Sequence, residues 1–348
     1  MIKELITAAG TVNSDRRKKL IIVFMAVLLL LGIIISVFLG QFDITPAQLW
    51  GIITSRMTGA EPFWTSQQEH VLWNVRMPRI LTACLVGSAL SCAGCVYQGV
   101  FENPMAAPDF LGASSGAALG AALAILLGLG EAMITALAFM ISLATICLVY
   151  LIGSRTRGNR TVGLVLAGLM VSALAQAGVS FIKLVADQTN QLPEITYWLM
   201  GSLTGTENND VFFAGVTIAI GMIPLLLLRW KINVLTVGEE EASSIGVKVP
   251  AVRAVSLICA TLLTAAAVSV SGMIGWVGLV VPHFCRKIIG NNYLFLMPAS
   301  ILTGAFFLLM VDNISRNLFV AEVPIGILTA VIGAPFFIYL ITKGGEPV

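Results

Sequence analysis

An uncharged stretch, Ile80 to Phe101, sets the first constraint on how this chain can fold. At about 1.5 Å per residue, a helix of this length crosses the hydrocarbon core of a bilayer. The stretch is crowded with glycine, alanine and serine, which let neighbouring helices approach closely in lipid. It therefore predicts a spanning helix that packs tightly among other helices.

Similar apolar runs recur along the chain. Hydrophobic residues make up 57% of its 348 residues and charged residues 11%, whereas about 25% of residues are charged in soluble domains. Such a chain cannot cover a surface that faces water. We therefore expect an all-α polytopic membrane protein with about ten spanning helices, built as one transmembrane domain over residues 1–348. The runs are Leu20–Leu39, Ile80–Phe101, Gly112–Gly128, Met133–Ile152, Thr161–Val185, Phe212–Leu228, Val252–Val270, Met273–Ile289, Leu294–Val311 and Ile325–Ile341.

The distribution of basic residues predicts the orientation. A basic cluster, residues 16–19, directly precedes the first run, and basic residues favour the cytoplasmic side. This places residues 1–19 in the cytoplasm. Counting runs from there puts most of the 20 basic residues on the cytoplasmic side and both termini inside. The expected location is the cytoplasmic (inner) membrane, with lipid as a partner.

The chain is broken directly after the second run. Asn103-Pro104 and then Pro108 interrupt the helix, and a second segment rich in glycine and alanine follows. Irregular backbone at membrane depth is tolerated only where protein or a water-filled cavity shields it. This is the pattern of a transport pathway. The residues that we expect to line it are Gln98, Asn103, Pro104, Ser172 and Gln176.

Two motifs carry a family resemblance. Residues 76–112 contain R-x-P-R, L-V-G-x-A-L, G-x-x-x-Q-x-x-F-x-N-P and A-x-P-x-x-L-G, and residues 271–286 read SGMIGWVGLVVPHFCR. Both closely resemble the permease subunits of type II ATP-binding-cassette importers for iron–siderophores, haem and vitamin B12. The resemblance covers Ile44 to Lys343.

The resemblance implies a set of partners. Such permeases work as homodimers or close heterodimers, with two ATPase subunits that bind ATP and Mg and an extracytoplasmic substrate-binding protein. The chain itself would bind no cofactor. We expect a ferric siderophore as cargo because that class of importer is the most numerous, and haem or cobalamin remains the alternative.

Three arginines on the predicted outer side run against the positive-inside bias: Arg76, Arg79 and Arg316. Read without the resemblance, they extend to lipid headgroups, and Asp312 pairs with Arg316 at i, i+4. By resemblance, arginines at these positions receive glutamates from the substrate-binding protein. Such charge complementarity favours orientation and on-rate.

The largest predicted cytoplasmic loop is residues 231–250. Its three consecutive glutamates suit the first turn of a helix, whose dipole is positive there, and a glycine can close that helix. A short solvated helix between two spans is the simpler interpretation. By resemblance, the pattern L-x-x-G-E-x-x-A-x-x-x-G is the coupling loop that seats in a groove of the ATPase. Its residues are Gly238, Glu239, Glu240, Ala242 and Gly246.

The sequence lacks the motifs of several function classes. The sequence holds no G-x-x-x-x-G-K-[ST], so we expect no ATP hydrolysis by this chain, no catalytic residue and no enzyme activity. His70 and His283 have no metal-binding spacing, and Cys92 and Cys95 lie in an apolar run where small buried cysteines pack like alanine. No metal site is therefore expected. The net charge of +2 is too small to suggest nucleic acid.

Two alternatives remain open. An ion-coupled secondary carrier would also suit broken spans, but it usually places carboxylates deep in the membrane, and acidic residues are scarce in these runs. A membrane-embedded enzyme would need a cluster of polar catalytic residues at one membrane face, and the sequence suggests none.

Overall fold

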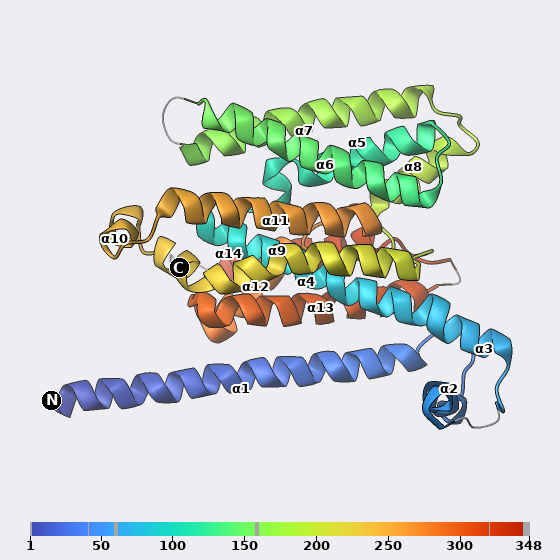
Figure 1. Cartoon of the computed structure of the whole chain (residues 1–348), viewed down its shortest axis with the longest axis horizontal. Coiled ribbons are helices and arrows are strands. Elements are labelled where there is room, and N and C mark those ends of the chain that lie inside the picture. The colour runs from blue at the N-terminus through green and yellow to red at the C-terminus, as the bar shows by residue number, and fades with distance from the viewer. Residues whose placement is uncertain (1, 41, 59–61, 157–159, 320, 344–348) are drawn as a thin grey trace.

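A computed structural model describes the chain except residues 1, 41, 59–61, 157–159, 320 and 344–348, and its long helices lie roughly along one axis (Figure 1). Seven helices in this described part are long and apolar enough to cross a membrane. They are α1 (Ile2–Phe38), α4 (Met77–Val100), α6 (Glu131–Ser154), α7 (Arg160–Val185), α9 (Asn208–Leu235), α11 (Val249–Ser271) and α13 (Tyr293–Asn317).

Three shorter helices complete the set: α5 (Ala113–Leu126), α12 (Val277–Ile289) and α14 (Ile325–Lys343). Each of the ten helices falls on one of the ten predicted runs, so the predicted all-α polytopic fold is confirmed. The third and eighth runs are indeed short, since α5 has 14 residues and α12 has 13.

The remaining helices are short and were not predicted as spans. A π-helical segment, η1, joins α3 to α4, so residues 66–100 form one continuous rod. Helix α10 lies in the loop that the sequence predicted to contain a short helix. These elements are α2 (Pro46–Thr58), α3 (Ser66–His70), η1 (Val71–Arg76), η2 (Pro108–Leu111), α8 (Gln191–Met200) and α10 (Glu239–Ser244).

The helices pack in layers. Helices α5, α6 and α7 lie together at the top of Figure 1, α1 lies along the bottom, and α4 passes through the middle. The start of α1 and the end of α14 lie at the same end of the bundle as α10, which an even number of crossings requires. We call this the α10 end. The opposite end, where α2, α3 and α8 lie, is the α3 end.

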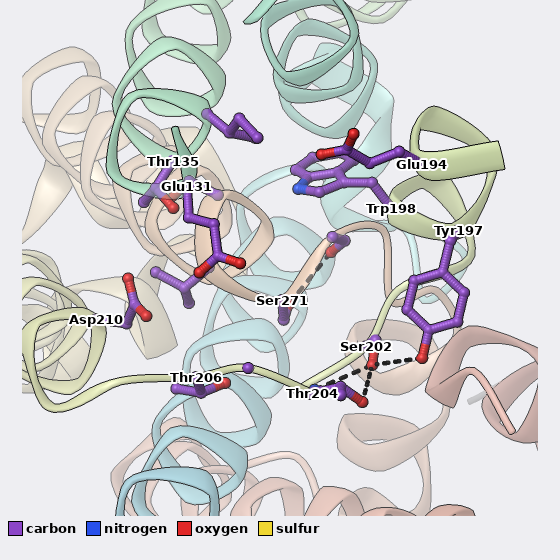
Figure 2. A pocket seen from close by; sticks show the side chains of 15 residues that line it. Glu131, Thr135, Glu194, Tyr197, Trp198, Ser202, Thr204, Thr206, Asp210 and Ser271 are labelled. Atoms are coloured by element: carbon purple, nitrogen blue, oxygen red, sulfur yellow. Dashed lines mark hydrogen bonds between the residues drawn. The ribbon is translucent and has the colours of Figure 1, made fainter. Parts of the chain in front are cut away.

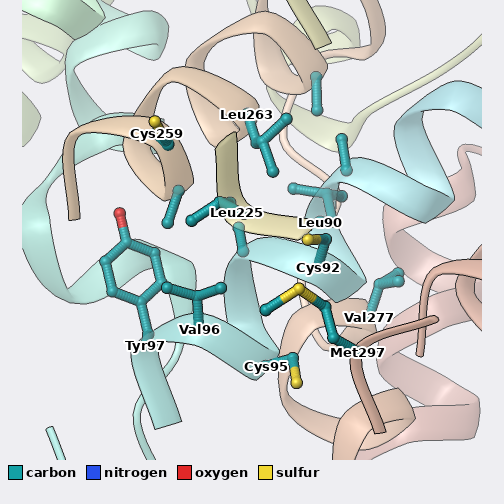
Figure 3. Packing of buried hydrophobic residues seen from close by; sticks show 14 of the residues in the cluster. Leu90, Cys92, Cys95, Val96, Tyr97, Leu225, Cys259, Leu263, Val277 and Met297 are labelled. Carbon is teal, nitrogen blue, oxygen red and sulfur yellow. The ribbon is translucent and has the colours of Figure 1, made fainter. Parts of the chain in front are cut away.

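Close backbone contacts hold α4 in the centre. A Cβ atom on Gly94 would lie 1.8 Å from the carbonyl oxygen of Gly278, and one on Gly87 would lie 2.2 Å from that of Gly304. Only glycine fits at such contacts, which are typical of membrane helices. Cys92 is buried in the same core (Figure 3), as the sequence predicted for a packing residue.

Candidate functional site

The three predicted docking arginines converge at the α3 end. Arg76 ends η1, Arg79 lies in the first turn of α4, and Arg316 lies in the last turn of α13. Their exposed fractions are only 3%, 6% and 6%. The structure thus places all three guanidinium groups inside the protein, where each needs hydrogen-bond partners.

Two carboxylates bind Arg79. Its Nε lies 2.8 Å from Oδ1 of Asp312, and its Nη1 lies 2.8 Å from Oε1 of Glu322. The second oxygen of Glu322 accepts a hydrogen bond of 2.5 Å from the hydroxyl of Thr204. Arg79 therefore ties α4 to α13, and through Glu322 to the α8–α9 loop.

Asp312 also contacts the second arginine. Its Oδ2 lies 3.5 Å from Nε of Arg316, one helical turn along α13, which confirms the pair that the spacing predicted. Nη2 of Arg316 donates to the carbonyl of Ser36, at 3.2 Å, and to Oδ1 of Asn313. One fully buried carboxylate thus serves two arginines and helps to hold α1 against α13.

Backbone carbonyls bind Arg76. Its Nη1 donates to the carbonyl oxygen of Val37 at 2.8 Å, and its Nη2 donates to that of Phe42. A Cβ atom on Gly40 would lie 2.7 Å from Nη2, so the backbone after α1 passes directly over the guanidinium group. Arg76 therefore fixes how the chain leaves α1.

Sequence reasoning missed Glu322. This residue lies in the loop between α13 and α14, outside the spanning helices and close to Arg316 in sequence. Burial raises its pKa, but hydrogen bonds from Arg79 and Thr204 outweigh burial and hold the pKa below its ordinary value. The available signal was an acid six residues after Arg316, on the same predicted side as the three arginines.

A cavity of about 170 Å³ lies beside this cluster, and Figure 2 shows the side chains that line it. Three of them are carboxylates from different elements, Glu131, Glu194 and Asp210. Ser202 and Thr204 both line the cavity, and the hydroxyl of Ser202 donates to that of Thr204 at 2.8 Å. Thr204 in turn donates to Glu322, so the cavity wall is connected to the arginine cluster. The α3 end therefore presents an acidic hollow, whereas Arg76, Arg79 and Arg316 are covered.

The α10 loop has the geometry that its sequence predicted. Gly238 precedes the helix with φ +147°, and Gly246 follows it with φ +83°, both values that favour glycine. At the C-terminal end, the N–H of Gly246 donates to the carbonyl of Ser243 and that of Val247 to the carbonyl of Ala242, each at 3.0 Å. This pair of bonds closes the helix rigidly. Ala242 is fully buried, so the helix is anchored on one side.

An ion pair fixes the start of α10 to α11. Oε1 of Glu239 lies 2.5 Å from Nη2 of Arg253. The next residue, Glu240, is exposed. A short helix anchored by Ala242 and by Glu239, with its other face free, is suited to transmit force between a partner and the bundle.

Gln98, one of the residues that the sequence predicted to line the pathway, lies between α4 and α12 in this structure. It is buried, and its Nε2 donates to the carbonyls of Gly278 (3.3 Å) and Leu279 (3.4 Å). Its Oε1 accepts a hydrogen bond of 2.5 Å from Nη1 of Arg286. Gln98 therefore fastens α4 to α12.

The other four predicted pathway residues are more accessible. Asn103 and Pro104 are exposed in the turn after α4, and on α7 Ser172 is half-buried and Gln176 exposed. The structure does not bring these two pairs into hydrogen-bonded contact with each other.

A second cavity, of about 180 Å³, lies where the chain breaks after α4. Pro108, Asp109 and Trp276 are among its lining residues. Trp276 has φ +70°, a strained backbone conformation for a residue other than glycine. Strained residues of this kind cluster at functional sites, so the hollow between η2 and the start of α12 is a candidate part of the transport route.

Comparison with known proteins decides the family. The model of the FecCD transport family matches residues 28–343. The chain belongs to this family. The permease is 37% identical to "Molybdate import system permease protein MolB" of Haemophilus influenzae, over 92% of this chain and 96% of that protein. It is 41% identical to a "Probable iron chelatin transport system permease protein" of Helicobacter pylori, over 78% of this chain and 82% of that protein.

A solved structure described as an inward-facing metal-chelate type ABC transporter matches the permease with a TM-score of 0.83 and 36% identity, covering 93% of this chain and 99% of that one. The permease is therefore a multi-pass membrane subunit of an ATP-binding-cassette importer. It is not itself catalytic, because ATP is hydrolysed on a partner ATPase subunit. The family also implies a substrate-binding protein as partner.

Proposed function

We propose that the permease imports an iron chelate, most specifically a ferric siderophore, that a substrate-binding protein delivers. The likeness to a metal-chelate type transporter over 93% of the chain carries this proposal. The Helicobacter relative, whose name refers to iron chelatin, supports iron as the metal. Two permease copies, or this chain and a close paralogue, would enclose the pathway, and two ATPase subunits would drive it.

The α10 end is proposed to face the cytoplasm in the inner membrane, with both chain termini on that side. The basic cluster before the first span favours this orientation. The ATPase would contact Gly238 to Gly246, and the exposed face of α10 is compatible with such a contact. Closure of the ATPase dimer would then move α10 and, through Glu239 and Arg253, the start of α11.

The α3 end is proposed to receive the substrate-binding protein. The guanidinium of Arg79 is already bound by Asp312 and Glu322, and we propose that a glutamate of the binding protein reaches it by replacing Glu322. Glu322 is partly exposed and lies in a loop, whereas Asp312 is fully buried on a helix. The exchangeable partner of Arg79 is therefore Glu322, and its replacement would loosen the contact with Thr204.

Molybdate is a second candidate cargo. The relative named as a molybdate permease matches nearly the whole chain, at 92% coverage. Both candidates are metal-containing solutes, and they differ in the metal that the binding protein would hold.

Affinity purification of the tagged permease from gently solubilised native membranes tests the proposal. We expect a P-loop ATPase and a binding protein to copurify, with iron in the small molecule that the binding protein holds. Molybdenum in that molecule would instead identify molybdate as the cargo. Recovery of the permease alone, repeated after cross-linking, would contradict the importer and favour an ion-coupled carrier.

A further inference from the structure

A continuous hollow runs along α6 and α11. Its apolar part has a volume of about 390 Å³ and is lined by residues such as Leu143, Ile146 and Leu262. A second part, of about 320 Å³, lies beside α10. Tyr150, Leu164 and Leu257 line both parts, so the two form one groove.

The apolar part opens away from the core of the chain. Ile258, which lines it, is 59% exposed, and Cys147 is also exposed. Both residues lie within helices that cross the membrane. An apolar trough at this depth is suited to a hydrocarbon chain, because burial of apolar surface there needs no polar partner.

The part beside α10 has a polar mouth. Arg253 lines it, and its Nε has no hydrogen-bond partner within the described part of the chain, although Nη2 is paired with Glu239. Two further cations flank the helices that form the walls, since Arg155 directly follows α6 and Lys248 directly precedes α11. Basic pockets between membrane helices at the bilayer interface bind anionic headgroups.

We propose that this groove binds an anionic phospholipid. One acyl chain fills the trough between Leu143 and Leu262, and the phosphate lies at Arg253. The phosphate competes with Glu239 for the guanidinium group, since both are anions directed at the same side chain. A bound lipid therefore loosens the tie between α10 and α11, which links the lipid environment to the position of α10.

Native mass spectrometry of the purified complex, titrated with phosphatidylglycerol or with phosphatidylcholine of the same acyl chains, tests the site. We expect tighter binding of phosphatidylglycerol, and Arg253→Gln should weaken it about fivefold, the value of one basic contact at the membrane surface. The matched control is Lys231→Gln, an exposed cation on α9 that lines neither part of the groove, and it should leave both affinities unchanged. Cys147→Trp should weaken the binding of both lipids, because the larger side chain fills the trough.

Glu239→Gln makes the test decisive. It breaks the same ion pair as Arg253→Gln but removes the competing anion, so phosphatidylglycerol should bind more tightly to it. If the pair had a purely structural role, the affinity for phosphatidylglycerol would change in the same direction in both variants. That result would overturn the proposal. Equal affinity of the unmodified complex for the two lipids would also overturn it, as would displacement of phosphatidylglycerol by millimolar inorganic phosphate.

Discussion

Nε of Arg79 and Oδ1 of Asp312 lie 2.8 Å apart, although 233 residues separate them in the sequence. The pair joins the start of α4 to the end of α13 in the interior of the α3 end. Removing charges from water is costly, and only good geometry and further hydrogen bonds offset that cost. Here Asp312 also contacts Arg316, and Arg79 also contacts Glu322, so the cluster is a chain of four charged groups.

Asp312→Asn should destabilise the permease strongly. It leaves two buried arginines without their shared carboxylate, and breaking a buried ion pair from one side costs about 3–5 kcal/mol. Thermal unfolding in detergent should show a clear loss of Tm. Glu240→Gln, at an exposed acid on α10, is the control and should leave Tm unchanged. An unchanged Tm for Asp312→Asn would mean that the cluster does not stabilise the fold.

Glu322→Gln should strengthen docking of the binding protein. The variant weakens the internal competitor for Arg79, and a hydrogen bond to a charged group contributes about 1.5–3 kcal/mol, so the affinity should rise about tenfold. Surface plasmon resonance with the loaded binding protein measures this.

Glu194→Gln is the matched control for docking. Glu194 is an exposed acid on α8, at the same end of the bundle, and it lines the acidic hollow without pairing with any of the three arginines. The control removes the same charge but frees no guanidinium group, so the affinity should change much less than in Glu322→Gln. Weaker docking of Glu322→Gln would contradict the exchange of partners at Arg79, as would an equal gain in both variants.

The contribution of Glu322 to stability should depend on pH only at acidic pH. Its folded pKa lies below its ordinary value, so its contribution is complete above about pH 4.3 and is lost as the pH falls through the folded pKa. The difference in Tm between the unmodified permease and Glu322→Gln should therefore be constant from about pH 5 to pH 8 and shrink below about pH 4. A difference that shrinks already between neutral pH and pH 5 would contradict the lowered pKa.

Gly246→Ala should uncouple ATP hydrolysis from uptake. A residue with a side chain is strained at φ +83° by about 1–2 kcal/mol, which weakens the closure of α10. We expect several-fold less cargo per ATP hydrolysed, measured in proteoliposomes.

Gly128→Ala is the matched control for this variant. Gly128 also has a left-handed φ, +66°, and, like Gly246, it has no atoms within 4 Å of an added Cβ, but it lies between α5 and α6. It should carry a similar backbone penalty with an unchanged ratio of cargo to ATP. Equal ratios in the two variants would argue against a coupling role for α10.

Local sequence signals predicted much of this fold. The ten spans followed from long apolar runs, α10 followed from glutamates between two glycines, and the Arg316–Asp312 pair followed from its i, i+4 spacing. Each of these features depends on residues close together in the chain, where periodicity and propensity act.

Long-range partners could not be predicted in the same way. Glu322 lies 243 residues from Arg79, and Arg286 lies 188 residues from Gln98. Which helices meet is decided by the close packing of α4 against α12 and α13, and no local pattern reports it. For this reason the burial of the arginines and the packing role of Gln98 emerged only from the structure.

ATP-driven uptake by the reconstituted complex tests the central claim most directly. The permease, its ATPase and its loaded binding protein would be placed in liposomes, and cargo inside them would be measured with ATP, with a non-hydrolysable analogue, and with a proton gradient alone. We predict accumulation only with ATP and only when the binding protein is present. Accumulation driven by the proton gradient without ATP would contradict the importer.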